Sequence, residues 1–243
     1  MITLFDRVRY KENAKVVLKR NYWPCFLVTL LFSLISGIGY NLVNIEVKLE
    51  QLELTATQLA RYIALIAPWA TVSGIIGIIL GYCVVNILQI GQARFFLDAR
   101  HGEYRLDNLL MVYKSGYFWN CVFVKFMMGI HVLLWSLLFI IPGIIVAYRY
   151  YFVDYILAEQ PDLGKDEVFA LSTEMTDGIK MDLFILDLSF IGWNLLDLIT
   201  FNLAHYLVAP YIESTKAEAY AAYSVQKEYY RNNAGYFEPN DRF

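Results

Sequence analysis

Charged side chains are scarce in this sequence. Asp, Glu, Lys and Arg account for 18% of its 243 residues, whereas hydrophobic residues account for 58% and the mean hydropathy is +0.43. About a quarter of the residues in a typical soluble domain are charged. The apolar surface therefore exceeds what a water-soluble fold buries, and we expect the chain to contact a lipid bilayer. The net charge is −3 and no basic stripe is present, which argues against a nucleic-acid partner.

Cysteines and catalytic motifs are also few. The three cysteines lie far apart inside apolar segments, a pattern that supports neither a disulfide framework nor a Cys-x-x-Cys metal or redox site. The sequence has no His-Glu-x-x-His zinc helix, no Gly-x-Ser-x-Gly elbow and no phosphate-binding loop. The three histidines lie in different segments, and His131 is interpreted as a core histidine. We therefore expect no catalytic residue, cofactor or metal site, and no enzymatic activity.

Long apolar runs are what the sequence does contain. A membrane-spanning helix needs about 20 apolar residues, because each residue rises about 1.5 Å against a hydrocarbon core of about 30 Å. The runs predict an all-α, polytopic membrane helix bundle with about six transmembrane helices. The predicted helices cover residues 22–43, 63–91, 118–141, 143–158, 183–200 and 203–231. In an alternative interpretation, 183–231 makes one tilted crossing followed by an interfacial helix.

Two features define the predicted connections between these helices. Pro142 and Gly143 interrupt a long apolar run, and they are expected to form a hairpin turn between the third and fourth helices, because proline lacks the helical N–H donor and glycine permits a turn. Lysine and arginine gather in the basic arm 1–21, in the 92–117 loop and after the last crossing. Such residues remain in the cytoplasm, so both termini are predicted to be cytoplasmic. Residues 1–231 form one predicted membrane domain, followed by a flexible cytoplasmic tail over 232–243.

The loop over residues 159–182 contains a predicted short helix. Val168, Leu171 and Met175 recur with helical spacing, after a start signal at Pro161 and before a stop at Gly178. The loop carries seven acidic and two basic residues, whereas the N-terminal arm is basic. The helix is expected to lie on the cytoplasmic face. It contacts the basic arm in one interpretation, and both faces are solvated in the other.

Six polar residues inside the predicted membrane helices are candidates for a buried network: Lys125, Arg149, Asp154, Asp187, Asn194 and Asp197. Ionisable residues are costly in lipid and usually face the interior of a bundle. Counting about 1.5 Å of depth per residue pairs Arg149 with Asp197 in an outer layer. The same count places Lys125 between Asp187 and Asp154 in an inner layer. In the alternative, Asp187 and Lys125 reach the cytoplasmic interface without a partner.

Small residues form one face of the second predicted helix. Ser73, Gly77 and Gly81 recur at intervals of four, a pattern that lets two helix backbones approach closely. The face packs either inside one protomer or against a second copy of the chain in a homodimer.

Several runs resemble the bacterial membrane family catalogued as domain of unknown function 975. They cover residues 141–148, 155–158, 170–175, 182–193 and 209–211, and the run 14–24 is also similar. A looser similarity extends to the membrane domains that precede some glycerophosphodiester phosphodiesterases. The resemblance implies a six-helix fold in a bacterial plasma membrane, with no known activity and no established catalytic residue.

Three functions are compatible with these observations. The first is a non-enzymatic membrane adaptor or assembly and regulatory factor, whose cytoplasmic segments contact another membrane or cytoplasmic protein. The second is a small-solute transporter or permease that uses the charges of the fourth and fifth helices. The third is a lipid-handling enzyme. The lipid bilayer is the one partner that all three share.

Overall fold

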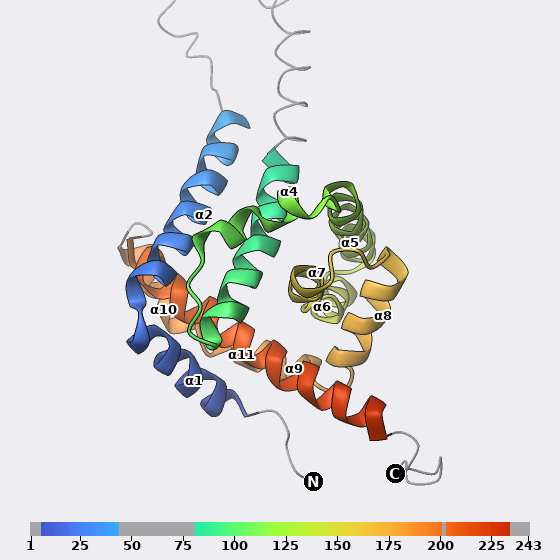
Figure 1. The fold of residues 1–243 in the computed structure, drawn as a ribbon. Coiled ribbons are helices and arrows are strands. Elements are labelled where there is room, and N and C mark those ends of the chain that lie inside the picture. Colours follow the sequence, from blue (N-terminus) through green and yellow to red (C-terminus); the bar gives the residue numbers. More distant parts are fainter. Residues whose placement is uncertain (1–5, 44–80, 201–202, 234–243) are drawn as a thin grey trace, which may run out of the picture.

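The computed structural model describes residues 6–43, 81–200 and 203–233, and these residues form helices without any strand, so the all-α class is confirmed (Figure 1). One helix occupies residues 81–100 and is called the 81–100 helix (teal in Figure 1). The others are α1 (Arg7–Arg20), α2 (Tyr22–Val43), η2 (Leu106–Leu110), α4 (Met111–Ser115), α5 (Phe118–Leu138), α6 (Ile140–Arg149), α7 (Val153–Glu159), α8 (Lys165–Thr176), α9 (Lys180–Leu188), α10 (Ile191–Ile199) and α11 (Leu203–Asn233).

The N-terminal arm forms the helix α1. Its N-cap is Asp6, whose carboxylate accepts hydrogen bonds from the backbone N–H groups of Val8 at 3.1 Å and Arg9 at 3.0 Å. Tyr10, Ala14 and Val17 are buried and recur with helical spacing. This face packs along α11, and Figure 1 shows the two helices side by side.

The helix α11 is the element on which the others assemble. Helices α1, α2, α8 and α10 all contact it. Its buried residues include Ala209, Ala217 and Ala219, whose small side chains allow neighbouring helices to approach closely. A second buried group on α11 is aromatic and packs against α7.

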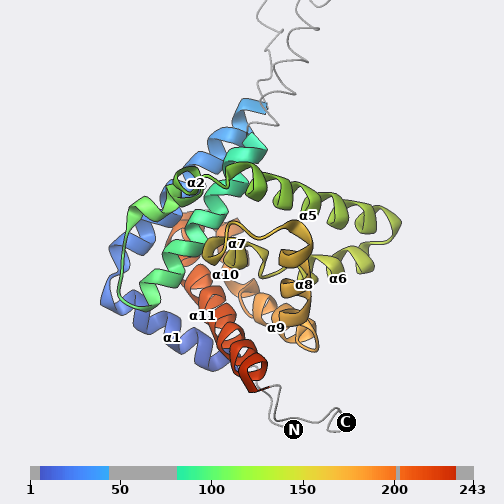
Figure 2. The same ribbon diagram turned by 45° about the vertical axis from the view of Figure 1, so that its right-hand side comes forward.

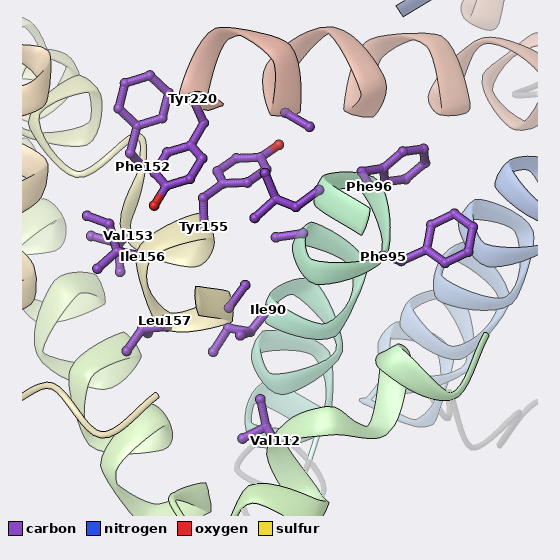
Figure 3. Close-up of a cluster of buried hydrophobic side chains, with 14 of the residues drawn as sticks. Ile90, Phe95, Phe96, Val112, Phe152, Val153, Tyr155, Ile156, Leu157 and Tyr220 are labelled. Atoms are coloured by element: carbon purple, nitrogen blue, oxygen red, sulfur yellow. The ribbon is translucent and has the colours of Figure 1, made fainter. Parts of the chain in front are cut away.

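The helix α7 lies at the centre of the hydrophobic core. Its apolar residues point toward the 81–100 helix, α5 and α11 and are buried, as Figure 3 shows for Val153, Tyr155, Ile156 and Leu157. The rings of Tyr155 and Tyr220 stack with their centroids 5.1 Å apart. Five of the seven residues of α7 are apolar and buried, and its two acidic residues, Asp154 and Glu159, are the ones that keep some exposure.

The turn between α5 and α6 lies earlier than predicted. Helix α5 ends at Leu138, Phe139 is extended, and α6 begins at Ile140, so Pro142 and Gly143 lie inside the first turn of α6. The first backbone donors of a helix have no partner within that helix, and proline is tolerated there because its missing N–H costs nothing. The prediction of a turn at Pro142 and Gly143 is therefore wrong by three residues.

Gly143 has a packing role instead. A Cβ atom at this position would lie 2.7 Å from the Cα atom of Ser136 in α5, which is closer than real Cβ atoms approach. The glycine therefore lets α6 lie directly against α5. Figure 2 shows the resulting α5–α6 hairpin projecting from the rest of the molecule.

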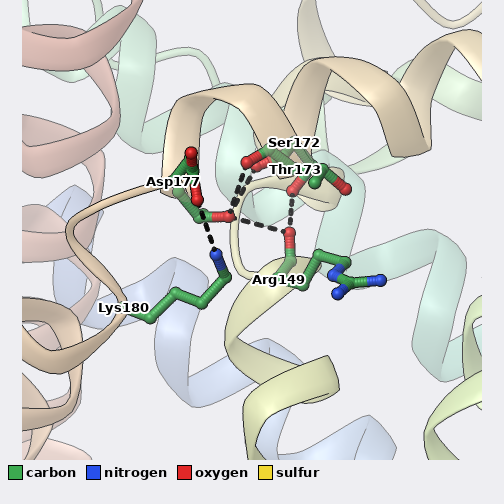
Figure 4. Close-up of polar contacts among 6 residues, drawn as sticks. Arg149, Ser172, Thr173, Asp177 and Lys180 are labelled. Carbon is green, nitrogen blue, oxygen red and sulfur yellow. Dashed lines mark hydrogen bonds and ion pairs between the residues drawn. The ribbon is translucent and has the colours of Figure 1, made fainter.

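Two helices predicted as continuous are each divided. The 143–158 prediction corresponds to α6 and α7, which a turn at residues 150–152 separates. In an uninterrupted helix the carbonyl of Arg149 would accept from Val153, but Val153 donates to Tyr150. The Ser172 hydroxyl donates to the Arg149 carbonyl at 2.9 Å (Figure 4). The Thr176 hydroxyl lies 3.2 Å from the same carbonyl oxygen and closer, at 2.8 Å, to the carbonyl oxygen of Ser172. Side chains of α8 thus stabilise the break. The 183–200 prediction likewise corresponds to α9 and α10, separated at residues 189–190.

Other helix boundaries can be compared with the predictions. The bounds of α2 coincide with the predicted 22–43 helix, and α8 is the predicted short helix, although it begins at Lys165 rather than near Pro161. The second predicted helix does not end at residue 91, because the 81–100 helix continues its buried apolar face through Phe95 and Phe96. Residues 63–80 and the tail beyond residue 233 lie outside the described ranges.

Two described helical stretches are long and apolar enough to cross a membrane. They are Phe118–Leu138, which is α5, and Ile140–Glu159, which takes α6 and α7 together. A shorter apolar stretch covers Tyr22–Ser36 in α2.

Candidate functional site

Lys125 of α5 is the most deeply buried charged residue that the structure describes, at 2% exposure. Its Nζ atom donates to Asp154 Oδ1 of α7 at 2.6 Å and to Gln89 Oε1 of the 81–100 helix at 3.1 Å. The ammonium group therefore joins three helices and has two acceptors, which a buried charge requires. The predicted contact between Lys125 and Asp154 is present, and Gln89 is a partner that sequence reasoning missed.

Asp187 does not share Lys125, which corrects the predicted inner layer. Its two carboxylate oxygens accept hydrogen bonds from the hydroxyls of Tyr148 at 3.0 Å and Tyr151 at 2.9 Å. The two tyrosine rings stack with their centroids 5.7 Å apart. On the predicted 143–158 helix, the spacing of three residues between Tyr148 and Tyr151 would put both on one face, a signal that could have revealed them as donors.

The predicted outer pair is also corrected. Arg149 does not bind Asp197, and its Nε atom is buried without a hydrogen-bond partner among the described residues. Asp197 instead lies 3.4 Å from His205, measured between Oδ2 and Nδ1. The predicted pairing was based on depth along continuous helices. Because the chain breaks after α6 and after α9, the side chains of Arg149 and Asp197 point in other directions. The side chain of Asn194 lies outside the described part of the chain.

A cavity of about 350 Å³ lies beside Asp187. It is lined by residues of α2, the 81–100 helix, α9, the α9–α10 turn and α11 and is partly open to the surface. The lining residues are Thr29, Phe32, Ser33, Gln92, Asp187, Phe190, His205, Ala209, Ile212, Glu213 and Lys216. Within this lining, Lys216 Nζ lies 3.3 Å from Glu213 Oε1. The cavity therefore combines hydroxyl, amide, imidazole, carboxylate and ammonium groups with two aromatic walls.

The cavity has the chemistry of a binding site for a small polar molecule. Two carboxylates and one ammonium leave a net charge of −1 when His205 is neutral, which favours a cationic or zwitterionic ligand. Cavities of this size commonly hold small molecules. Sequence reasoning missed Glu213 and Lys216, although their spacing of three residues on a predicted helix was available. Among the described residues, no group of three or more His, Cys, Asp or Glu is arranged to hold a metal ion.

The remaining sequence candidates lie in other places. His131 Nδ1 is 3.1 Å from the hydroxyl of Tyr150, so this histidine has a hydrogen-bond partner. Ser73 and Gly77 lie outside the described ranges, and a Cβ atom at Gly81 would meet no described atom within 4 Å. A close approach occurs instead at Gly91, where a Cβ atom would lie 2.7 Å from the Cα atom of Leu109.

The basic arm and the acidic helix are separate in the structure. Lys11 of α1 places its Nζ atom 4.2 Å from the ring centre of Phe190 and 3.4 Å from the carbonyl oxygen of Ser189. Burial, followed by the charges of Arg7 and Lys15, lowers the pKa of Lys11. No ion pair joins α1 to α8 in the described residues.

Helix α8 presents an acidic surface. Val168, Phe169, Ser172, Met175 and Thr176 form its buried face. Its exposed acidic residues are Asp166, Glu167 and Glu174, and Asp177 follows at its C-terminal end. Lys165 and Lys180 pair with the first and last of these four, as Figure 4 shows for Asp177 and Lys180.

Residues 137–227 match the family model described as "Protein of unknown function (DUF975)". This segment, called the DUF975 segment below, is similar to that family. The resemblance read from the sequence is thereby confirmed for α6 to α11, whereas the similarity to glycerophosphodiester phosphodiesterases is not shown. No curated protein and no solved structure matches the chain.

The DUF975 segment supplies most of the charged groups of the site. Asp187, His205, Glu213 and Lys216 all lie within residues 137–227. The segments outside the DUF975 match complete the cavity with residues of α2 and with Gln92, and they provide Lys125 to Asp154. The site is therefore built jointly by the DUF975 segment and the N-terminal half of the chain.

Proposed function

We propose that this chain is a multi-pass integral membrane protein of a bacterial plasma membrane, with both termini in the cytoplasm. The crossings predicted on either side of residue 201 are not included, because the Leu207 carbonyl accepts from Tyr22 at the cytoplasmic start of α2 and residues 203–207 rise only about 6 Å. The exposed apolar α5–α6 hairpin carries this proposal. At its tip, Leu137 is 74% exposed and Ile140 is 76% exposed. The other exposed apolar residues of the hairpin include Leu133, Leu134, Trp135, Leu138, Phe139, Ile141, Ile144 and Ile145.

The energetics favour a lipid environment for this hairpin. Burying one large apolar side chain is worth about 1.5–3 kcal/mol, so leaving this group in water forgoes a large stabilisation. The 21 residues of α5 rise about 1.5 Å each and extend roughly 30 Å, which is the thickness of the hydrocarbon core. The one lysine of α5 is neutralised inside the protein by Asp154, so the lipid-facing surface of the helix is apolar.

Reporter fusions test the topology. Fusions after residues 21, 105, 170 and 235 are expected to report a cytoplasmic location, and fusions near residues 52 and 142 an external one. An external location after residue 235 would contradict a cytoplasmic C-terminus, and a cytoplasmic location near residue 142 would contradict insertion of the hairpin.

Within the membrane, we propose a non-enzymatic adaptor or assembly role. The acidic surface of α8 supports it, because this helix is anchored to α6 through the Arg149 carbonyl and its acidic residues are exposed. Such a surface fits a basic segment of a partner protein.

The experiment is purification of tagged protein from solubilised membranes. A stoichiometric partner is expected with the native chain and is expected to be lost in the Asp166→Lys/Glu174→Lys variant. The matched control is Glu103→Lys/Asp107→Lys, which reverses two acids outside α8 and is expected to retain the partner. Equal recovery from both variants would contradict a role for α8.

A small-solute transporter is the second candidate, and the cavity beside Asp187 favours it. Its net negative charge suggests ethanolamine as a cationic probe and glycine as a zwitterionic probe. Either solute is expected to raise the melting temperature of the native protein but not of Asp187→Asn or Glu213→Gln. An unchanged melting temperature with both probes would argue against this candidate.

A further inference from the structure

The junction between α1 and α2 forms an open groove of about 560 Å³. Its lining residues are Lys15, Leu18, Lys19, Arg20, Asn21, Tyr22 and Trp23. Three of these seven residues are positively charged and none is acidic. The groove thus combines a concentrated positive charge with the aromatic residues that begin a long apolar helix.

The positive charge of α1 has no counter-charge within the described chain. The six cations of the arm are Arg7, Arg9, Lys11, Lys15, Lys19 and Arg20, and none of them forms an ion pair with a described residue. By contrast, Arg94, Arg100 and Lys216 each bind a carboxylate. The single acid of α1, Glu12, does not line the groove. Among the described residues, therefore, no carboxylate neutralises this surface.

The aromatic residues of the groove mark a membrane interface. Tyr22 is held in place, because its hydroxyl donates to the Leu207 carbonyl at 3.1 Å and its ring stacks on Phe26 at 5.9 Å. Trp23 remains 69% exposed beside the three cations. Tryptophan and tyrosine are enriched where a membrane helix enters the headgroup region, since their rings have an apolar body and a polar edge.

We infer that this groove binds the headgroup of an anionic phospholipid in the cytoplasmic leaflet. The phosphate lies against Lys15, Lys19 and Arg20, and Trp23 lies at the boundary between the headgroup and the acyl chain. Lysine contributes compact positive charges, and the planar guanidinium of Arg20 can donate two parallel hydrogen bonds to one phosphate. The inference rests on the proposed membrane location, and it adds a specific lipid class and a specific site to it.

The test compares lipid binding by two variants that each lose two charges from α1. Lys15→Gln/Lys19→Gln removes cations from the groove, and Arg7→Gln/Arg9→Gln removes exposed cations of the same helix outside it. Purified protein in detergent receives phosphatidylglycerol or phosphatidylcholine, and retained lipid is counted by native mass spectrometry. All four side chains removed are exposed, so both variants are expected to melt at the native temperature in phosphatidylcholine.

The native protein and the Arg7→Gln/Arg9→Gln variant are expected to prefer phosphatidylglycerol. Each basic residue near an anionic surface contributes roughly a five-fold increase in binding, so Lys15→Gln/Lys19→Gln is expected to lower the preference roughly 25-fold at low salt. An equal loss in both variants would show a diffuse charge effect and overturn the groove as the site. Full competition by inorganic phosphate would assign the site to a free anion and overturn the lipid.

A second experiment separates this inference from the membrane proposal. Extraction of cell membranes with alkaline carbonate measures integration directly for the native chain. A chain that is released from the membrane contradicts the proposed function. A chain that stays in the membrane but shows no preference for phosphatidylglycerol contradicts the lipid site alone.

Discussion

Lys125 and Asp154 are 29 residues apart in the sequence, yet their Nζ and Oδ1 atoms lie 2.6 Å apart. The contact joins the exposed α5–α6 hairpin to α7, the helix at the centre of the core. Its two ends differ, because Lys125 is almost fully buried whereas the Asp154 side chain retains 29% of its exposure. This asymmetry determines what happens when either partner is removed.

Asp154→Asn is expected to destabilise the protein more than Lys125→Met. Loss of the carboxylate leaves a buried ammonium without a counter-charge, which costs about 3 kcal/mol, whereas loss of the ammonium leaves a carboxylate that reaches solvent. The double variant is expected to lose less than the sum of the two single variants. Denaturant unfolding in detergent measures all three, and the partly exposed pair of Arg94 and Asp98 is the control, with an expected coupling of about 0.5 kcal/mol or less. Additive losses at Lys125 and Asp154 would contradict the pairing.

Gly143→Ala is expected to destabilise the hairpin. The added Cβ atom would lie 2.7 Å from the Cα atom of Ser136, so α6 must move away from α5. Overpacking of this kind costs about 1–3 kcal/mol. Gly192→Ala in α10 is the matched control, since a Cβ atom there meets no described atom within 4 Å, and it is expected to be neutral or stabilising by up to about 1 kcal/mol. A comparable melting temperature for both variants would argue against the close approach.

The hydroxyls of Ser172 and Thr176 are expected to act redundantly on the Arg149 carbonyl. Ser172 is the closer donor, and Thr176, whose shortest contact is 2.8 Å to the Ser172 carbonyl, can turn its one hydroxyl proton to Arg149 when Ser172 is replaced. Ser172→Ala and Thr176→Val are therefore each expected to cost about 1 kcal/mol or less. The double variant leaves the carbonyl without a donor and is expected to cost more than the sum. Hydrogen exchange of α8 measures the effect, with Thr173→Val as a control on the same helix. Strict additivity would show that the two hydrogen bonds act independently.

Hydropathy predicted where apolar helices occur but not where they break. It located α2 correctly, because the limits of that helix coincide with the limits of an apolar run. It could not locate the division between α6 and α7, since the donors that stabilise it come from Ser172 and Thr176 of a helix further along the chain. The turn at Phe139 was predicted three residues too late, because proline is compatible with the first turn of a helix as well as with a position after its end.

The candidate site was predicted only in part, because the sequence does not show where the helices break. The depth of a residue in the membrane can be counted along a helix from the sequence, and this count correctly paired Lys125 with Asp154. Rotation about the helix axis depends on the breaks, and it determines that Asp187 meets Tyr148 and Tyr151 rather than Lys125. Glu213 and Lys216 belong to the more polar part of α11, so a search for charges inside apolar runs did not consider them.

The most direct test of the membrane location is the environment of the hairpin tip. Spin labels attached at Leu137→Cys and Ile140→Cys, after replacement of the three native cysteines, report collisions with oxygen and with a water-soluble nickel chelate in reconstituted bilayers. Both positions are expected to show high oxygen and low nickel accessibility, whereas Glu167→Cys on α8 is expected to show the reverse. High nickel accessibility at Leu137 and Ile140 would place the hairpin in water and contradict the account.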